Sequence, residues 1–185
     1  MGTRGLYGFR KNGEDKLLYV NNDAYPSFMG KEVIEFCLVA GHDGLNNIHD
    51  KITRLLEESS PATEEDIKKY GDISYLKGMD VVDNYTLFHY LQHNPKGYLG
   101  DIDVTVTNNE FIKDSLFCEY AYIINLDSDM FEYWTGFQER ATRGNRYGED
   151  LNDDGYYPCK LILEIPLKDM SIYGLEKTLE MMMEA

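Results

Sequence analysis

Four side chains near the start of the chain have types that suit covalent catalysis. They are Thr3, Arg4, Asp23 and Tyr25. An N-terminal Thr whose own amine acts as base is a known nucleophile arrangement, and a strand, turn and strand follow it here. The difficulty is that removal of Met1 leaves Gly2, not Thr3, at the terminus. An N-terminal-nucleophile-like amidohydrolase is therefore an alternative reading. The plainer one is that Thr3 and Arg4 begin a strand and Asp23 caps a turn.

A basic cluster in the second half of the chain is the candidate binding site. Arg140, Arg143 and Arg146 recur every three residues, and Tyr147 follows them. Guanidinium groups beside an aromatic ring suit a phosphate group or an RNA backbone. The alternative is pairing within the chain to the acidic run 149–154.

Two patterns raise the question of a metal. His89 and His93 are four residues apart on an expected helix, but no third ligand or HExxH glutamate accompanies them. Asp150–Gly155 matches the first half of a calcium loop, yet Leu161 stands where the loop needs Glu. We expect histidines on the surface or at caps, an Asx-rich turn at 150–155, no metal and no cofactor.

Composition limits the classes of function. The 185 residues carry a formal net charge of −15, so direct DNA binding, which depends on Lys and Arg, is not expected. Such acidity suits solubility, a basic protein partner or imitation of nucleic acid by carboxylates. Three widely spaced cysteines fit reduced thiols in a cytoplasm. No signal peptide or membrane-length apolar run is expected.

Two hairpins are the clearest elements that position these residues. In the first, Asn12-Gly13 separates two apolar strands within residues 1–20, and in the second, residues 127–129 separate strands 119–126 and 130–137. A further strand is predicted at 160–167. Residues 140–157 form a long Gly/Asn/Asp-rich loop.

The remaining segments have helical or ambiguous patterns. Gly41 is expected to end the first helix, and Thr63 to cap a later one. Helices are predicted at 30–40, 43–59, 63–70, 84–92, 110–118 and 175–183, and extended chain at 73–82 and, less clearly, 98–108. This order indicates one α+β domain over residues 1–185, with an antiparallel sheet built from the N-terminal and C-terminal hairpins and packed with several helices.

The N-terminal thirty residues also resemble a known group of proteins. Met1–Gly5 reads M-G-T-R-G, and Tyr19 precedes Asp23-Ala24-Tyr25-Pro26 and Gly30. This pattern is similar to that of small proteins carried by phages and mobile elements, and the Tyr-rich segment 119–134 is similar as well. Some of that family are grouped with anti-CRISPR proteins that block type II RNA-guided nucleases, including by loss or truncation of the guide RNA. Ala24 stands where Ser is common in the family, and no catalytic residues are carried over.

These observations lead to a functional hypothesis. The leading reading is a cytoplasmic anti-defence protein that inhibits a type II RNA-guided nuclease through its acidic surface, by causing guide RNA loss, or both. Its partner would be the nuclease or its guide RNA complex, with no membrane involved. The amidohydrolase and a non-catalytic regulatory binding module remain as alternatives.

Overall fold

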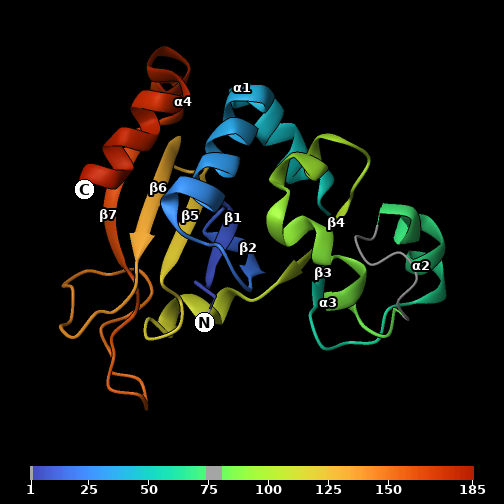
Figure 1. The fold of residues 1–185 in the computed structure, drawn as a ribbon, viewed down its shortest axis with the longest axis horizontal. Coiled ribbons are helices and arrows are strands. Elements are labelled where there is room, and N and C mark those ends of the chain that lie inside the picture. Colours follow the sequence, from blue (N-terminus) through green and yellow to red (C-terminus); the bar gives the residue numbers. More distant parts are fainter. Residues whose placement is uncertain (1, 74–80) are drawn as a thin grey trace.

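The computed structural model describes residues 2–73 and 81–185, and it has an α+β fold (Figure 1). The main sheet has five strands in the order β2-β1-β5-β6-β7. The strands are β1 (Gly5–Lys11), β2 (Glu14–Val20), β5 (Tyr120–Asn125), β6 (Met130–Thr135) and β7 (Lys160–Pro166). The predicted fold class and both hairpins are thereby confirmed.

The two hairpins join through a parallel pair, β1 with β5, in an otherwise antiparallel sheet. Asn12 and Gly13 both have positive φ, 56° and 75°, as a type I′ turn requires. Asp127, in the turn of the second hairpin, accepts hydrogen bonds from the backbone N–H groups of Asn12 and Gly13 at 2.6 and 2.9 Å. The tips of the two hairpins are therefore bonded to each other.

Helices α1 (Lys31–Lys51) and α4 (Leu167–Glu184) pack against each other on one face of the sheet (Figure 1). The main core lies between them and the sheet, where Tyr7, Phe9 and Phe131 are almost fully buried beside helix residues such as Phe36. A smaller core around Leu6 and Trp134 covers the opposite face.

A smaller subdomain-like extension carries the second sheet. Strands β3 (Arg54–Glu57) and β4 (Val104–Thr107) pair in parallel, with helices α2 (Glu64–Tyr70) and α3 (Asn84–Leu87) nearby (Figure 1). Short 3₁₀ helices occupy 71–73, 89–93, 95–99 and 109–113, and one π-helical turn occupies 26–30.

Several helix boundaries differ from the sequence prediction. Gly41, at φ 65°, does interrupt α1, and Thr63 does cap α2 by accepting from the N–H of Asp66. The helix predicted at 43–59 is wrong beyond Lys51, because Thr53 N–H and Arg54 N–H donate to the carbonyl of Asp103 and the chain enters β3. Pairing with β4 here outweighs the helical spacing of the apolar residues.

Two other helices also depart from the predictions. The helix at 84–92 breaks at Phe88 into α3 and a 3₁₀ segment, in which the carbonyl of Leu91 accepts from the buried Tyr7 hydroxyl at 2.5 Å. The segment 110–118 is helical only over Asn109–Lys113. The last helix begins at Leu167, earlier than predicted, and bends at Gly174. Most of the extended segment predicted at 73–82 lies outside the described residues.

Candidate functional site

The turn that follows β2 lines a polar cavity of about 660 Å³. Asn21, Asn22 and Asp23 form one side of the cavity, and Phe28 and Glu32 contribute from the start of the α1 region. The opposite side comes from the segment that follows α3, with His89, Tyr90, His93, Asn94 and Lys96. Carboxylates, amides, imidazoles and aromatic rings therefore meet in one place, although they are far apart in the sequence.

Asp23 has a backbone conformation that is uncommon for a residue other than glycine, with φ 56°. Asn22 Nδ2 donates to Asp23 Oδ2 at 3.2 Å. The next residue is fixed on both sides, because Ala24 N–H donates to the Thr3 carbonyl at 3.1 Å and its own carbonyl accepts from the buried Tyr122 hydroxyl at 2.7 Å. The surrounding bonds thus fix the backbone at Asp23, whose side chain lines the cavity.

Both histidines, His89 and His93, are partly exposed side chains that line the cavity. His93 Nε2 lies 3.1 Å from Asn21 Oδ1, an acceptor, so this nitrogen carries the proton. The buried Nδ1 atoms of His89 and His93 have no hydrogen-bond partner among the described residues. Burial lowers the pKa of both imidazoles, and each therefore favours its neutral form.

Among the charged side chains that line the cavity, carboxylates outnumber lysines. Lys96 Nζ lies 2.7 Å from Glu35 and 3.2 Å from Glu32. These contacts, the one with Glu35 foremost, raise the pKa of Lys96. Lys96 is thus shared by two carboxylates, of which Glu35 also lies 3.9 Å from Lys31 Nζ, and Asp23 adds a third negative charge. The cavity consequently has a net negative charge when its imidazoles are neutral.

The four residues proposed for catalysis do not share the cavity. Of these, only Asp23 lines the cavity. The Arg4 guanidinium instead lies 4.4 Å from the centre of the Phe117 ring, and Tyr25 is 38% exposed with its ring 6.2 Å from that of Phe28. Thr3 contributes a backbone carbonyl to the turn. This arrangement does not supply a nucleophile with a base and an oxyanion site.

The basic cluster divides into two exposed arginines and one that is engaged within the fold. Arg140 and Arg143 are exposed on the loop between β6 and β7. Arg146 donates to both oxygens of Glu132, at 2.7 and 2.5 Å, and its guanidinium lies 4.7 Å from the Trp134 ring centre. Tyr147 packs edge-on against Trp134.

The partner of Arg146 is a residue that our sequence analysis missed. Glu132 is 1% exposed, and besides Arg146 its carboxylate accepts from Asn125 Nδ2 at 2.7 Å and Trp134 Nε1 at 2.9 Å. A lone carboxylate within the apolar strand MFEYWT was the available signal, because a buried charge requires a partner. Arg146 therefore has a structural role, and only Arg140 and Arg143 remain available to a ligand.

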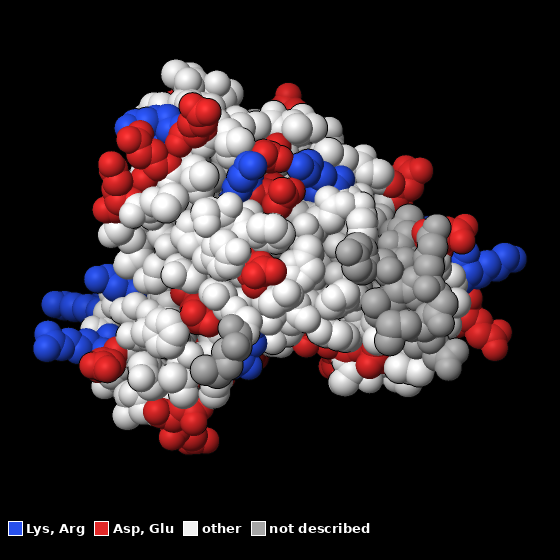
Figure 2. Space-filling model, in the orientation of Figure 1, with Lys and Arg blue, Asp and Glu red and all other residues white. Residues whose placement is uncertain are grey.

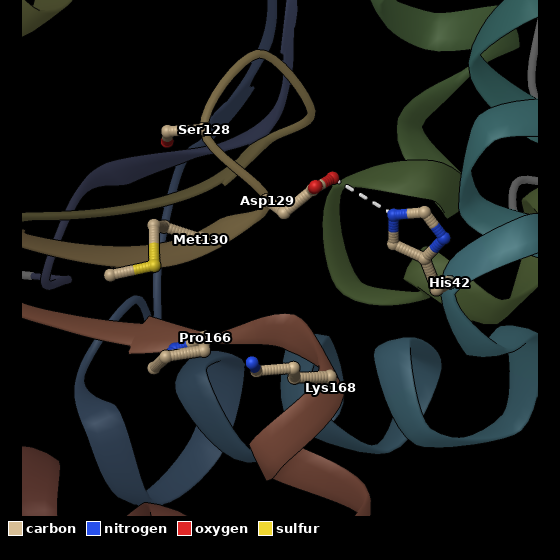
Figure 3. Close-up of a pocket in the computed structure, with 6 residues that line it drawn as sticks. All are labelled: His42, Ser128, Asp129, Met130, Pro166 and Lys168. Carbon is tan, nitrogen blue, oxygen red and sulfur yellow. Dashed lines mark hydrogen bonds and ion pairs between the residues drawn. The ribbon is translucent and has the colours of Figure 1, made fainter.

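A second pocket, of about 510 Å³, lies where α1, the turn between β5 and β6, and the start of α4 meet. Figure 3 shows His42 bonded to Asp129, with Nε2 2.8 Å from Oδ1, while Ser128 lies apart from the pair. Lys168 lines the pocket from α4. His, Asp and Ser are all present, but their placement does not form a catalytic triad.

This pair predicts a measurable pH dependence of stability. Asp129, and secondly Asp43, raise the pKa of His42 above its ordinary value. Its contribution to stability is therefore full below about pH 6.5, the unfolded pKa, and is lost as pH rises through the folded pKa. We expect His42→Gln to reduce the free energy of unfolding by at most about 1 kcal/mol at pH 6, since the pair is solvated, and by less at pH 8.5.

Urea unfolding of both proteins across this pH range measures the difference between them. The comparison cancels the other histidines, whose pKa values are lowered. Asp129→Asn, which tolerates the positive φ at this position, should remove the same pH-dependent part. A difference between wild type and His42→Gln that grows with pH would contradict the assignment.

The loop at 150–155 is an Asx turn. Asn152 Oδ1 accepts from the N–H groups of Asp154 at 3.1 Å and Tyr156 at 2.8 Å, so it is engaged with the backbone. Within residues 2–73 and 81–185, no group of three or more His, Cys, Asp or Glu side chains has a geometry that could hold a metal ion. Cys37, Cys118 and Cys159 are buried thiols.

Across the described part of the chain, no helix combines the length and apolarity needed to cross a bilayer. No protein-family model, curated protein or solved structure matches this chain.

Proposed function

We propose that this protein is a non-catalytic inhibitor that binds a type II RNA-guided nuclease through an acidic surface on α4. The observation that carries the proposal is a row of carboxylates, Glu176, Glu180 and Glu184, exposed at intervals of four residues. On a helix this interval places successive carboxylates about 6 Å apart on one face. We call this row the α4 acidic row.

Apolar side chains accompany the row. Met183, in the same helical segment as the row, is 64% exposed, and Ile172, before the bend at Gly174, is 77% exposed. Protein-binding surfaces commonly combine apolar contact area with charges that guide the encounter. Exposed apolar side chains and carboxylates both occur on α4, which lies at the periphery of the molecule (Figure 1).

The distribution of charge favours a local acidic surface over a uniformly acidic one. In the view of Figure 2, the carboxylates lie in separate groups, several of them beside Lys or Arg, and one group follows α4. Many cations are occupied by pairs within the chain, as in Lys96 with Glu35 and Arg54 with Asp66. In the acidic row, Lys177 pairs with Glu180 alone, which leaves Glu176 and Glu184 to attract a partner.

Such a nuclease is a suitable partner because it holds guide and target in positively charged channels. Carboxylates on α4 would compete for the same Lys and Arg side chains. In the same complex we expect Arg140 and Arg143, exposed on the loop between β6 and β7, to contact guide RNA. Basic side chains project from this region in Figure 2.

The test is binding to a guide-loaded type II nuclease, measured by biolayer interferometry in low and high salt. We expect Glu176→Gln, Glu180→Gln and Glu184→Gln, combined, to weaken binding at low salt by about tenfold or more, since about 1.4 kcal/mol corresponds to a factor of ten. Wild-type affinity should fall steeply with salt, and that of the variant less so.

A matched control changes the same number of charges elsewhere. Glu14→Gln, Glu139→Gln and Asp153→Asn, combined, alter three exposed carboxylates outside α4 and should leave low-salt affinity within about twofold of wild type. Equal losses in both triple variants would contradict the α4 surface, and no binding by wild type would remove the proposed function. Gel analysis of the guide RNA in the same mixtures tells whether it is shortened.

A further inference from the structure

We infer that the cavity beside Asp23 is a recognition site for a guanidinium group. The inference does not rest on inhibition of a nuclease, because the ligand chemistry follows from the side chains that line the cavity and binding can be measured on the chain alone.

The carboxylates at the cavity favour a positively charged ligand. Asp23 Oδ2 accepts from Asn22, and Asp23 Oδ1 has no hydrogen-bond partner among the described residues. The other carboxylate in the lining, Glu32, shares Lys96 with Glu35, which is the nearer partner at 2.7 Å and also lies 3.9 Å from Lys31 Nζ. A cation that enters the cavity therefore meets an Asp23 carboxylate that no lysine or arginine of the described residues pairs with.

Several donors of the cavity are already in use. Asn94 Nδ2 donates to the Tyr90 hydroxyl, Asn22 Nδ2 donates to Asp23, and Lys96 is held by its two carboxylates. An anionic ligand such as phosphate or a carboxylate would be repelled by Asp23. A ligand that mainly donates fits the remaining acceptors.

The walls favour a flat cation. Phe28, 41% exposed, and Tyr90 line the cavity together with the rings of His89 and His93. Guanidinium is planar, is less strongly hydrated than ammonium, stacks on aromatic faces and pairs with a carboxylate through two parallel hydrogen bonds. The imidazoles do not oppose it, because their unpartnered, buried Nδ1 atoms fit neutral rings.

The structure of the site also explains why Asp23 adopts its uncommon backbone. Its positive φ is maintained by bonds on the neighbouring residue, from Ala24 to Thr3 and from Tyr122 to Ala24. These bonds hold the backbone at Asp23 in place before any ligand arrives, which lowers the ordering cost of binding.

The experiment is an NMR titration of the full chain with two matched peptides at pH 7.5. Acetyl-Gly-Arg-Gly-amide carries the guanidinium, and the same peptide with citrulline replaces it by a neutral urea of the same shape. We expect the arginine peptide to shift the ring signals of His89 and His93 in a saturable manner, with those of His42 unmoved, and the citrulline peptide to bind at least tenfold more weakly.

Variants place the interaction on Asp23. Asp23→Asn retains the shape of the side chain and tolerates positive φ, but it removes the charge. We expect it to weaken binding of the arginine peptide at least tenfold. Asp153→Asn, an equal charge change on an exposed loop, should bind as wild type. Equal binding of the two peptides, unaffected affinity in Asp23→Asn, or no shift at His89 and His93 would each overturn the inference.

Agmatine, a free guanidinium compound, distinguishes the two sources of this chemistry. Tighter binding of the peptide than of agmatine identifies an arginine side chain of a protein partner, and the reverse order identifies a small metabolite. Failure here leaves the α4 acidic row untouched, since that surface is tested by nuclease binding of variants in α4.

Discussion

Replacement of Glu132 by Ala is expected to destabilise the protein by about 3–5 kcal/mol, the usual cost of removing one partner from a buried ion pair. The Glu132 carboxylate accepts from Arg146, Trp134 and Asn125, and it is 1% exposed. Without it, the half-buried Arg146 guanidinium and the Trp134 N–H lose their acceptor together. Chemical denaturation monitored by Trp134 fluorescence measures the loss.

The control for this prediction is a carboxylate of the same kind on the surface. Glu139→Ala changes an exposed residue close to β6, and its effect should stay within about 0.5 kcal/mol. A second variant, Glu132→Ala with Arg146→Met, removes the uncompensated charge and should recover part of the stability. If Glu132→Ala proved as stable as wild type, Arg146 would be free to serve as a binding residue after all.

The other large effect is expected at Gly136, immediately after β6. A Cβ atom at this position would lie 2.1 Å from the carbonyl oxygen of Cys118 and 2.6 Å from that of Ser115. Both are backbone atoms, so no side chain can move aside to relieve the overlap. We expect Gly136→Ala to destabilise the protein by about 3 kcal/mol or more, at the upper end of overpacking effects, in thermal and urea unfolding.

Gly100 provides the matched comparison. The atom nearest to a Cβ added at Gly100 would be the Gly97 carbonyl oxygen, at 3.6 Å. The φ of Gly100, −83°, is accessible to any residue. Gly100→Ala should therefore be neutral or slightly stabilising, because it reduces the freedom of the unfolded chain. Equal stabilities for the two alanine variants would show that the chain around Ser115 and Cys118 adapts more readily than its hydrogen bonds suggest.

Local patterns were sufficient to predict much of the fold. Asn12-Gly13 identified the first hairpin, Thr63 the start of α2, and Gly41 the interruption of α1. Each of these signals depends on the backbone preference of one or two residues, so it does not require knowledge of distant contacts.

Features that depend on distant partners could not be predicted in this way. Residues 54–57 have apolar spacing suited to a helix, yet they pair with β4, about fifty positions later. Similarly, the sequence identifies Asp23 as a candidate, but it predicts His89 and His93 to be surface or capping residues and not neighbours of Asp23 at a cavity. Sequence spacing does not indicate which turn will lie against which segment. The set of residues that meet at the cavity depends on tertiary packing.

The parallel pairing of β1 with β5 has a consequence for synthesis in the cell. Gly5 pairs with Tyr120, so the first strand emerges from the ribosome long before its neighbour has been translated. During that interval the β1 edge has no strand to complete it, and contacts this remote in sequence slow folding. Nascent chains arrested before residue 120 should therefore remain sensitive to protease in their first twenty residues, and resistance should appear only after the second hairpin has left the exit tunnel.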